Sequence, residues 1–437
     1  MQTASTAVPE PQTQEEEYNK QEQNRNFWVA IFQGIFGRIS FSLSDSTTVL
    51  SAFIYKLTAS NTLVGLTGSL MSVGWMWPQL LISNLLEHKP RKMPAYILGM
   101  SVHTAVWLAA AVCTVWIGAR NYALLAAGFI FLYFLGTSSM GASSVAYMDI
   151  ISKTIEPLRR ARFFSIGNFI GGFFTIFIGF LVRYILSDAS GFVFPNNYAL
   201  LFFGVAFMAV ISLFVFLKIR EPIRPVQTER KTFWQHIKQG PHFLRTDRNY
   251  RDFIVYRIFV NVGRMCMPFY VPYALDKLSI SDGTIGLFLA VGAVSGVLSN
   301  ILWGYMSGRY GVRWILICTA LLACTAPLVA ICIQFIPSAW QLPFYFLTFV
   351  LGGASMSGMM VGFMTYMINI APPLNRPTYI GFMNTLVFPF GFMPVLAGEL
   401  IGWIGYEYTF SIALGVGFFA FITSTRLEEV YHDEEFR

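Results

Sequence analysis

The 437-residue chain is 55% hydrophobic and 16% aromatic, and only 12% of its residues are charged. A soluble chain of this length could not bury so much apolar surface with so few charges, so a soluble fold is excluded. The composition instead indicates a protein whose main solvent is lipid. The net charge is +7, but Lys and Arg are spread between apolar stretches, so we expect no nucleic-acid partner.

The first 25 residues are polar, acidic and rich in glutamine, and they lack the basic start and short apolar core of a cleaved signal. We expect a disordered cytoplasmic tail over residues 1–25. The five cysteines all fall inside apolar stretches without the spacing of metal ligands. We therefore expect no disulfide, no metal site and no cofactor.

Apolar stretches long enough to cross a bilayer as helices recur twelve times along the chain. The expected spans are 27–55, 62–85, 93–118, 122–151, 162–186, 198–218, 252–275, 283–306, 313–336, 341–369, 378–402 and 406–424. Basic residues concentrate in the connections 87–92, 153–162, 218–251 and 309–313. Because basic short loops stay on the cytoplasmic side, we predict a multi-pass protein of the plasma (inner) membrane with both termini cytoplasmic.

The longest polar connection, 219–251, divides the spans six and six. We predict an N-terminal six-helix bundle over 26–218, a cytoplasmic linker over 219–251, a C-terminal six-helix bundle over 252–425 and a cytoplasmic tail over 426–437. Residues 232–244 mix aromatic and basic side chains, which indicates a short amphipathic helix at the membrane surface. A simple tether is the alternative interpretation.

An internal repeat supports this division into halves. Residues 135–168 align without gaps on residues 351–384, at a shift of 216 positions, with ten identical pairs. A second block, 56–66, aligns on 277–287 at a shift of 221 positions. A repeat at half the chain length is too long for a solenoid, and in a membrane chain it is typical of a transporter built from two related bundles.

With this layout, the chain resembles the major facilitator superfamily. The segment Gly304-Tyr-Met-Ser-Gly-Arg-Tyr-Gly-Val-Arg313 is similar to the loop signature G-x-x-x-D-R-x-G-x-R of that family, with Gly308 in place of the acid. The resemblance implies an all-α membrane protein of twelve transmembrane helices, arranged as two six-helix bundles with pseudo-two-fold symmetry. It assigns no subfamily and no substrate.

The same resemblance implies a network of charges that closes the cytoplasmic side in one state and releases it in another. Asp149 is predicted to pair with a basic residue of the cytoplasmic connections. The candidate gate residues are charged side chains in or near these connections: Glu87, Lys92, Asp149, Arg160, Arg309 and Arg313. A static surface ion pair is the alternative interpretation.

Charged side chains inside spans are costly in lipid and usually face a cavity. Arg38 and Asp45 lie seven residues apart in the first span, as do Arg257 and Arg264 in the seventh, so each pair is predicted to share a helix face. The arginines would bind a carboxylate or phosphate, and Asp45 would carry a coupled proton. A structural ion pair between Arg38 and Asp45, or a snorkelling Arg257, is the alternative.

Uncharged side chains inside spans complete the candidate substrate site: Gln33, Asn261, Asn384 and Trp75. Such residues could line a cavity for an amphipathic solute, or they could only pack helices together. His103, by contrast, is predicted to be a buried packing histidine.

No phosphate-binding loop, metal motif or nucleophile constellation occurs in the sequence, so we do not expect an enzyme. We predict a secondary active transporter that moves a small solute, preferentially an organic anion, by alternating access coupled to protons or to exchange. Its partners would be this solute, H⁺ as the coupling ion and the lipid bilayer, and the protein would be monomeric. The alternatives are a proton-coupled exporter of lipophilic or drug-like compounds and a non-transporting membrane sensor or scaffold.

Overall fold

A computed structural model describes residues 11–87, 89–118, 120–222, 243–371 and 376–429. These residues form long helices, and no strand occurs among them. The N-terminal half contains α1 (Pro11–Leu43), α2 (Val49–Thr58), α3 (Asn61–Glu87), α4 (Met93–Gly118), α5 (Tyr122–Thr154), α6 (Pro157–Leu186) and α7 (Asn196–Phe216). The C-terminal half contains α9 (Arg248–Gly263), α10 (Tyr270–Lys277), α11 (Gly283–Tyr310), α12 (Val312–Cys332), α13 (Ser338–Ile370), α14 (Arg376–Val387) and α15 (Met393–Ser424).

The described helices have the length and surface of membrane-spanning segments. Eight helical segments within the described ranges are long and apolar enough to cross a membrane. One of them, Phe382–Ser424, contains two of the predicted spans, which meet at Gly405, where a φ of 85° turns the chain in the left-handed region that favours glycine. Trp116, Phe335 and Trp403 are 72%, 78% and 78% exposed, as expected for side chains that face lipid.

Three predicted spans, 27–55, 252–275 and 378–402, are broken helices. The first stops between α1 and α2, the second passes through the 3₁₀ turn η2 (Met267–Phe269), and the third passes through η4 (Phe388–Phe392). The prediction of a continuous helix is wrong at these points. Pro268 and Pro389 lie in two of the breaks, and proline removes the backbone N–H that a continuous helix would need.

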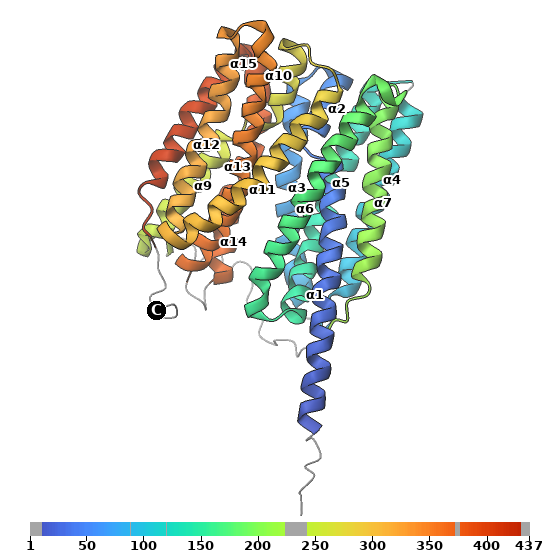
Figure 1. The fold of residues 1–437 in the computed structure, drawn as a ribbon, viewed down its shortest axis with the longest axis vertical. Coiled ribbons are helices and arrows are strands. Elements are labelled where there is room, and N and C mark those ends of the chain that lie inside the picture. The colour runs from blue at the N-terminus through green and yellow to red at the C-terminus, as the bar shows by residue number, and fades with distance from the viewer. Residues whose placement is uncertain (1–10, 88, 119, 223–242, 372–375, 430–437) are drawn as a thin grey trace, which may run out of the picture.

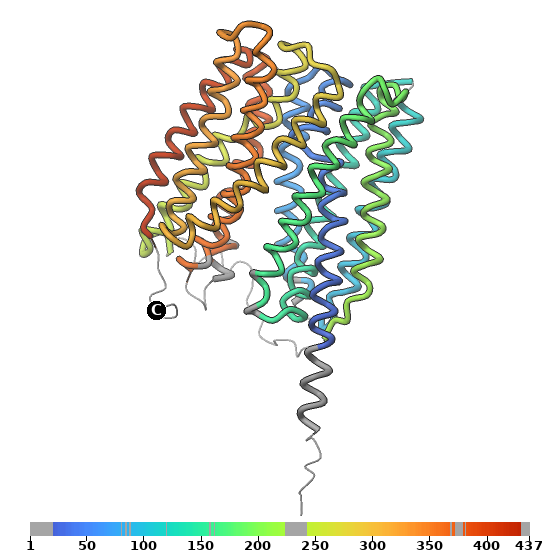
Figure 2. The backbone as a smooth tube through the Cα atoms, viewed as in Figure 1, coloured from blue at the N-terminus to red at the C-terminus, as the bar shows by residue number. Residues whose placement is uncertain are grey.

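The two halves contact each other mainly through two pairs of long helices, α6 with α11 and α3 with α15, and less extensively through α2, which contacts α10 and α11. They converge at the end that carries α2 and α10 and diverge toward the end that carries the first turns of α1 (Figures 1 and 2). A Cβ atom added to Gly179 of α6 would lie 2.6 Å from the Cβ of Ala290 on α11. Glycine therefore permits the close approach of these two helices.

Polar contacts between described residues of the two halves lie at the converging end. They are an ion pair between Lys56 and Asp282, a 2.8 Å hydrogen bond that the Thr62 hydroxyl donates to Glu399, and a 2.9 Å hydrogen bond that the Tyr406 hydroxyl donates to Asn61. Lys56 and Asn61 lie at the junction of α2 and α3, and Asp282 precedes α11. These contacts hold the halves together at the end opposite the first turns of α1.

We expect Asp282→Asn to let the halves separate at this end. The ion pair is about three-quarters buried, with side-chain exposures of 24% for Lys56 and 29% for Asp282. Its loss should therefore shift the ratio of molecules with separated halves to molecules with joined halves by at most about fivefold. Electron-electron distance measurements between spin labels at Arg120 and Ser338, in a variant without native cysteines, should show a longer distance. The charge swap Lys56→Asp with Asp282→Lys should restore it. An unchanged distance distribution would mean that this ion pair does not hold the halves together.

Candidate functional site

Arg264 lies at the break after α9, near the middle of the seventh span, and methionine sulfur surrounds its guanidinium. Nε donates to Met267 Sδ at 3.1 Å, Nη1 to Met359 Sδ at 2.9 Å and Nη2 to Met356 Sδ at 2.8 Å. A thioether is a weak acceptor, whereas the guanidinium carries five strong donors and a permanent charge. The contacts therefore hold the side chain in place without neutralising it.

Arg257 lies two turns earlier on α9, and it also reaches α13 and α14. Its Cζ sits 4.3 Å from the centre of the Phe363 ring, and Nη1 lies 3.9 Å from Met383 Sδ. Its Nε atom is buried and has no hydrogen-bond partner. Because Arg257 and Arg264 both contact α13, the predicted common face of the seventh span is confirmed.

Arg38 reaches toward α6, where Nη2 donates to the Asn168 amide oxygen at 3.2 Å. It is not the symmetry mate of Arg264. The shift of 221 positions that superposes the two halves here places Leu43, the last residue of α1, opposite Arg264, which follows the end of α9. Arg38 and Arg264 therefore lie at different heights relative to the helix breaks, and it is Arg257 that falls within two positions of the counterpart of Arg38.

None of these three arginines has an acidic partner in the part of the chain that the structure describes. The ion pairs found there involve Lys56, Lys153, Arg220 and Arg248. A guanidinium inside a membrane span without a counter-charge is costly, and such charges usually face a site that supplies one. The three arginines thus form a set of unneutralised cations inside the membrane domain.

The predicted common face of Arg38 and Asp45 is wrong, because α1 ends at Leu43 and Asp45 lies in the break before α2. Asp45 Oδ1 accepts hydrogen bonds from the backbone N–H and the hydroxyl of Thr47, at 3.0 and 2.7 Å, and from those of Thr48, at 2.9 and 2.9 Å. This pattern anchors one carboxylate oxygen locally and organises the start of α2. The carboxylate is held by the break itself rather than by an arginine.

The uncharged candidates separate into two groups. Gln33 and Trp75 line a cavity inside the N-terminal half. Asn261 donates to the backbone oxygen of Arg257 at 2.8 Å, one turn back on its own helix. Asn384 is half-buried on α14, next to Met383, which contacts Arg257. The structure therefore brings Asn384 near the arginines of the seventh span and leaves Gln33 and Trp75 elsewhere.

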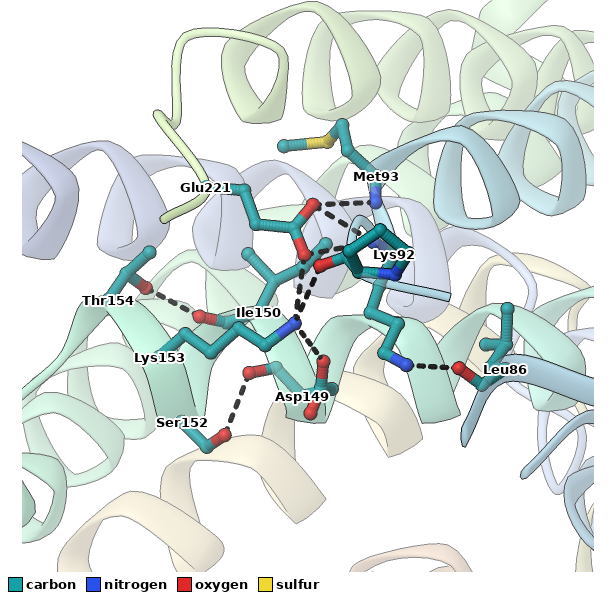
Figure 3. A network of polar contacts seen from close by, with 10 residues as sticks. Leu86, Lys92, Met93, Asp149, Ile150, Ser152, Lys153, Thr154 and Glu221 are labelled. Carbon is teal, nitrogen blue, oxygen red and sulfur yellow. Dashed lines mark hydrogen bonds and ion pairs between the residues drawn. The ribbon is translucent and has the colours of Figure 1, made fainter. Parts of the chain in front are cut away.

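A network of charges lies where α4, α5 and the segment after α7 meet (Figure 3). The Glu221 carboxylate accepts from the backbone N–H groups of Lys92, at 2.8 and 3.0 Å, and of Met93, at 2.9 Å, and so caps α4. Lys153 Nζ lies 3.1 Å from Glu221 and 2.6 Å from Asp149. The predicted pairing of Asp149 with a basic residue of this connection is confirmed, in Lys153, which lies one turn further along α5.

The C-terminal half carries a similar cap. The Glu429 carboxylate accepts from the backbone N–H groups of Val312, at 2.9 Å, and Arg313, at 3.1 Å, while Arg313 Nη2 donates to the Thr425 oxygen at 2.7 Å. Gly311, with φ at 91°, makes the tight turn before α12. In each half, a glutamate that follows the sixth membrane span thus caps the helix of the third span, which is α4 or α12.

The other gate candidates make local contacts. Lys92 Nζ donates to the Leu86 oxygen, and Arg160 donates to two backbone oxygens near the end of α5, at 3.1 and 2.7 Å. Arg309 Nη1 donates to the Tyr305 hydroxyl at 2.7 Å. The Glu87 side chain and most of the predicted amphipathic helix, residues 232–242, lie outside the described residues.

Sequence reasoning missed Glu221 and Glu429, because both follow the last apolar stretch of a half and were counted as linker and tail. It also missed the three methionine sulfur atoms that contact the Arg264 guanidinium. A signal for the two acids was present: each is a glutamate placed within a few residues of the end of a sixth span. The methionine contacts had no such signal, because they depend on the packing of α9 against α13.

The fold and the unneutralised arginines define a polytopic membrane protein with two related helical halves around a charged interior. Residues 253–435, in the C-terminal half, match the family model of the Major Facilitator Superfamily, which assigns no subfamily. This match and the fold support a secondary transporter of a small solute rather than an enzyme. No curated protein sequence matches the chain.

Solved transporter structures have the same fold. A D-xylose-proton symporter is 13% identical with a TM-score of 0.68, covering 92% of this chain and 97% of its own. A nucleoside transporter, NupG, is 13% identical with a TM-score of 0.64, covering 91% and 98%. A bacterial homologue of the iron transporter ferroportin, 13% identical, has a TM-score of 0.68 in its inward-facing state, covering 92% and 98%. At such low identity the likeness concerns the fold alone.

Proposed function

We propose that this transporter carries a small organic anion, which Arg264, Arg257 and Arg38 bind through its carboxylate, phosphate or sulfonate group. The observation that carries the proposal is the absence of any acidic partner for these three arginines among the described residues. The Arg264 donors point at sulfur, a weak acceptor that an oxyanion would readily replace. An oxyanion would accept two parallel hydrogen bonds from one guanidinium.

The methionines around this site suit the organic part of such a solute. Met356, Met360 and Met364 follow each other at four-residue spacing on α13, and they are 43%, 54% and 63% exposed. Thioether side chains are flexible and polarizable, so they adapt to an apolar group of irregular shape. An arginine held in place beside a row of flexible, apolar methionine side chains favours an amphipathic anion over a sugar or a metal ion.

In alternating access, the two ends of the membrane domain would have different roles. The halves are joined at the end that carries α2 and α10. The basic connections cluster at the other end, which supports a plasma (inner) membrane protein with both termini in the cytoplasm. This conformation would then face inward, and the charge network of Asp149, Lys153 and Glu221 would belong to the inner gate. Coupling would be to protons or to a second anion.

Proton-coupled export of lipophilic compounds depends on a free carboxylate inside the membrane. Asp45 was the candidate, and its four local hydrogen bonds give it a role in the break between α1 and α2. That alternative therefore loses the free carboxylate that it assigned to Asp45.

The test is thermal stabilisation of the purified protein by matched probes. Succinate, phenyl phosphate and benzenesulfonate supply three oxyanions, while methyl phenyl sulfone, which has no O–H or N–H donor, and benzyltrimethylammonium keep an aromatic ring without the negative charge. At 100 times its dissociation constant a ligand adds about 2.7 kcal/mol of stability. We expect at least one anion to stabilise the protein and neither uncharged nor cationic probe to do so. Equal stabilisation by methyl phenyl sulfone, or none by any anion, would overturn the proposal.

A further inference from the structure

The cavity that Gln33 and Trp75 line lies inside the N-terminal half, away from α9 and α13. Helices α1, α3, α4, α5 and α7 line it, and its volume is about 200 Å³. An apolar cavity of about 150 Å³ is large enough to bind benzene in another protein. Aromatic side chains from three helices form much of the wall: Trp75, Tyr96, Trp107, Tyr133 and Tyr147. The space is therefore suited to one planar ring.

Gln33 presents an unused hydrogen-bond acceptor in this wall. The side chain is 8% exposed, and its Oε1 atom has no partner among the described residues. The orientation of the amide is fixed, because the Ser212 hydroxyl donates to the Gln33 backbone oxygen at 3.2 Å and so must accept from Gln33 Nε2, at 3.1 Å. Nε2 also donates to the Tyr96 hydroxyl, at 3.3 Å. A buried acceptor left without a donor is costly.

Other polar groups of the wall also offer acceptors. Ser40, Ser143 and Ser144 line the cavity, but each hydroxyl donates its proton to a backbone oxygen, at 3.0, 2.8 and 2.7 Å. His103 Nδ1 lies 3.0 Å from the Gly136 oxygen, which can only accept, so in the neutral ring Nε2 is an acceptor. The wall thus contains several oxygen and nitrogen atoms that can accept a hydrogen bond but have no free proton to donate.

We propose that this cavity is a binding site for an uncharged aromatic ring that carries an O–H or N–H donor, of the size of a phenol or an aniline. The ring packs among the tryptophan and tyrosine side chains, and its donor bonds to Gln33 Oε1. Arg38 does not line the cavity, and neither do Arg257 and Arg264. The site is therefore separate from the arginines of the proposed anion site, and it does not depend on them.

The test uses ¹⁹F NMR line broadening of 4-fluorophenol and 4-fluorotoluene, which have similar shapes but differ in the donor. The protein is held in lipid nanodiscs, and empty nanodiscs give the broadening that comes from lipid alone. We expect saturable broadening of 4-fluorophenol that exceeds that of 4-fluorotoluene. Gln33→Leu should weaken 4-fluorophenol binding about tenfold and remove the preference for the phenol.

Filling the cavity provides the second arm. A side chain at Gly34, which lines the cavity, meets no atom within 4 Å of its Cβ, so Gly34→Leu should occupy the space and abolish the broadening. Gly128→Leu is the matched control, because its Cβ also meets no atom within 4 Å and the residue does not line the cavity. Arg264→Met should leave the broadening unchanged. Broadening that survives Gly34→Leu, or that is equal for both probes, would overturn the site, whatever the result for the anion probes.

Discussion

Replacing Arg264 with methionine is expected to weaken binding of the stabilising anion by about 100-fold, because the charge-assisted hydrogen bonds of one guanidinium contribute about 2–3 kcal/mol to binding. The variant without ligand should be at least as stable as the wild type. The new side chain joins a cluster of methionines, and it removes a charge that has no acidic partner among the described residues. Thermal unfolding with and without each anion measures both effects.

Two further variants make this prediction sharper. Arg264→Lys keeps the charge but loses the planar pair of donors, so it should retain part of the affinity. Arg248→Gln removes an arginine whose side chain is 78% exposed at the start of α9, and it should leave the affinity unchanged. If Arg264→Met binds the anion as tightly as the wild type, or if Arg248→Gln has the same effect as Arg264→Met, the anion does not sit at Arg264.

The largest loss of stability is expected for Glu221→Gln. The side chains of Glu221 and Lys153 are only 4% and 8% exposed, and breaking a buried ion pair costs about 3–5 kcal/mol when the remaining charge has no other partner. Asp149 stays 2.6 Å from Lys153, so the loss should approach the lower end of this range. The variant also weakens the cap on α4, which Glu221 provides to two successive backbone N–H groups. Thermal unfolding in the same detergent should show a much lower transition for this variant than for the wild type.

Glu429→Gln is the matched control. Glu429 caps α12 as Glu221 caps α4, but none of the ion pairs found in the described chain involves it, so this variant should cost only about 1 kcal/mol. Adding Lys153→Met to Glu221→Gln should recover part of the loss, because it removes a buried ammonium that has lost Glu221 and leaves Asp149, which is 37% exposed, to water. Equal losses for the two glutamate variants would show that the cap, and not the ion pair, dominates.

Much of the fold follows from the sequence. Apolar stretches separated by basic connections predict the spans, and the repeat predicts two related halves. The breaks at 44–48, 264–269 and 388–392 were missed because the surrounding residues are apolar enough to hide them. Signals were nevertheless present in Asp45, Thr47 and Thr48, which can bond to nearby backbone, and in Pro268 and Pro389.

The candidate site was less predictable. Rare charges inside spans identify Arg38, Arg257 and Arg264, but periodicity along one helix says nothing about which atoms of other helices approach them. The contacts of Arg264 with Met356 and Met359, and of Arg38 with Asn168, are fixed by packing between helices far apart in the chain. Gln33 and Trp75 were expected beside the arginines, and packing places them in the separate cavity of the N-terminal half.

The central claim is that the two halves move an organic anion across the membrane by way of Arg264. The most direct measurement is anion exchange in proteoliposomes. The anion is the one among succinate, phenyl phosphate and benzenesulfonate that stabilises the protein most. The vesicles are loaded with this anion, and the same anion, labelled, is then added outside. The account predicts saturable uptake that depends on internal anion and that falls by about 100-fold in Arg264→Met. Saturable binding without uptake, or uptake that is unchanged in Arg264→Met, would contradict it.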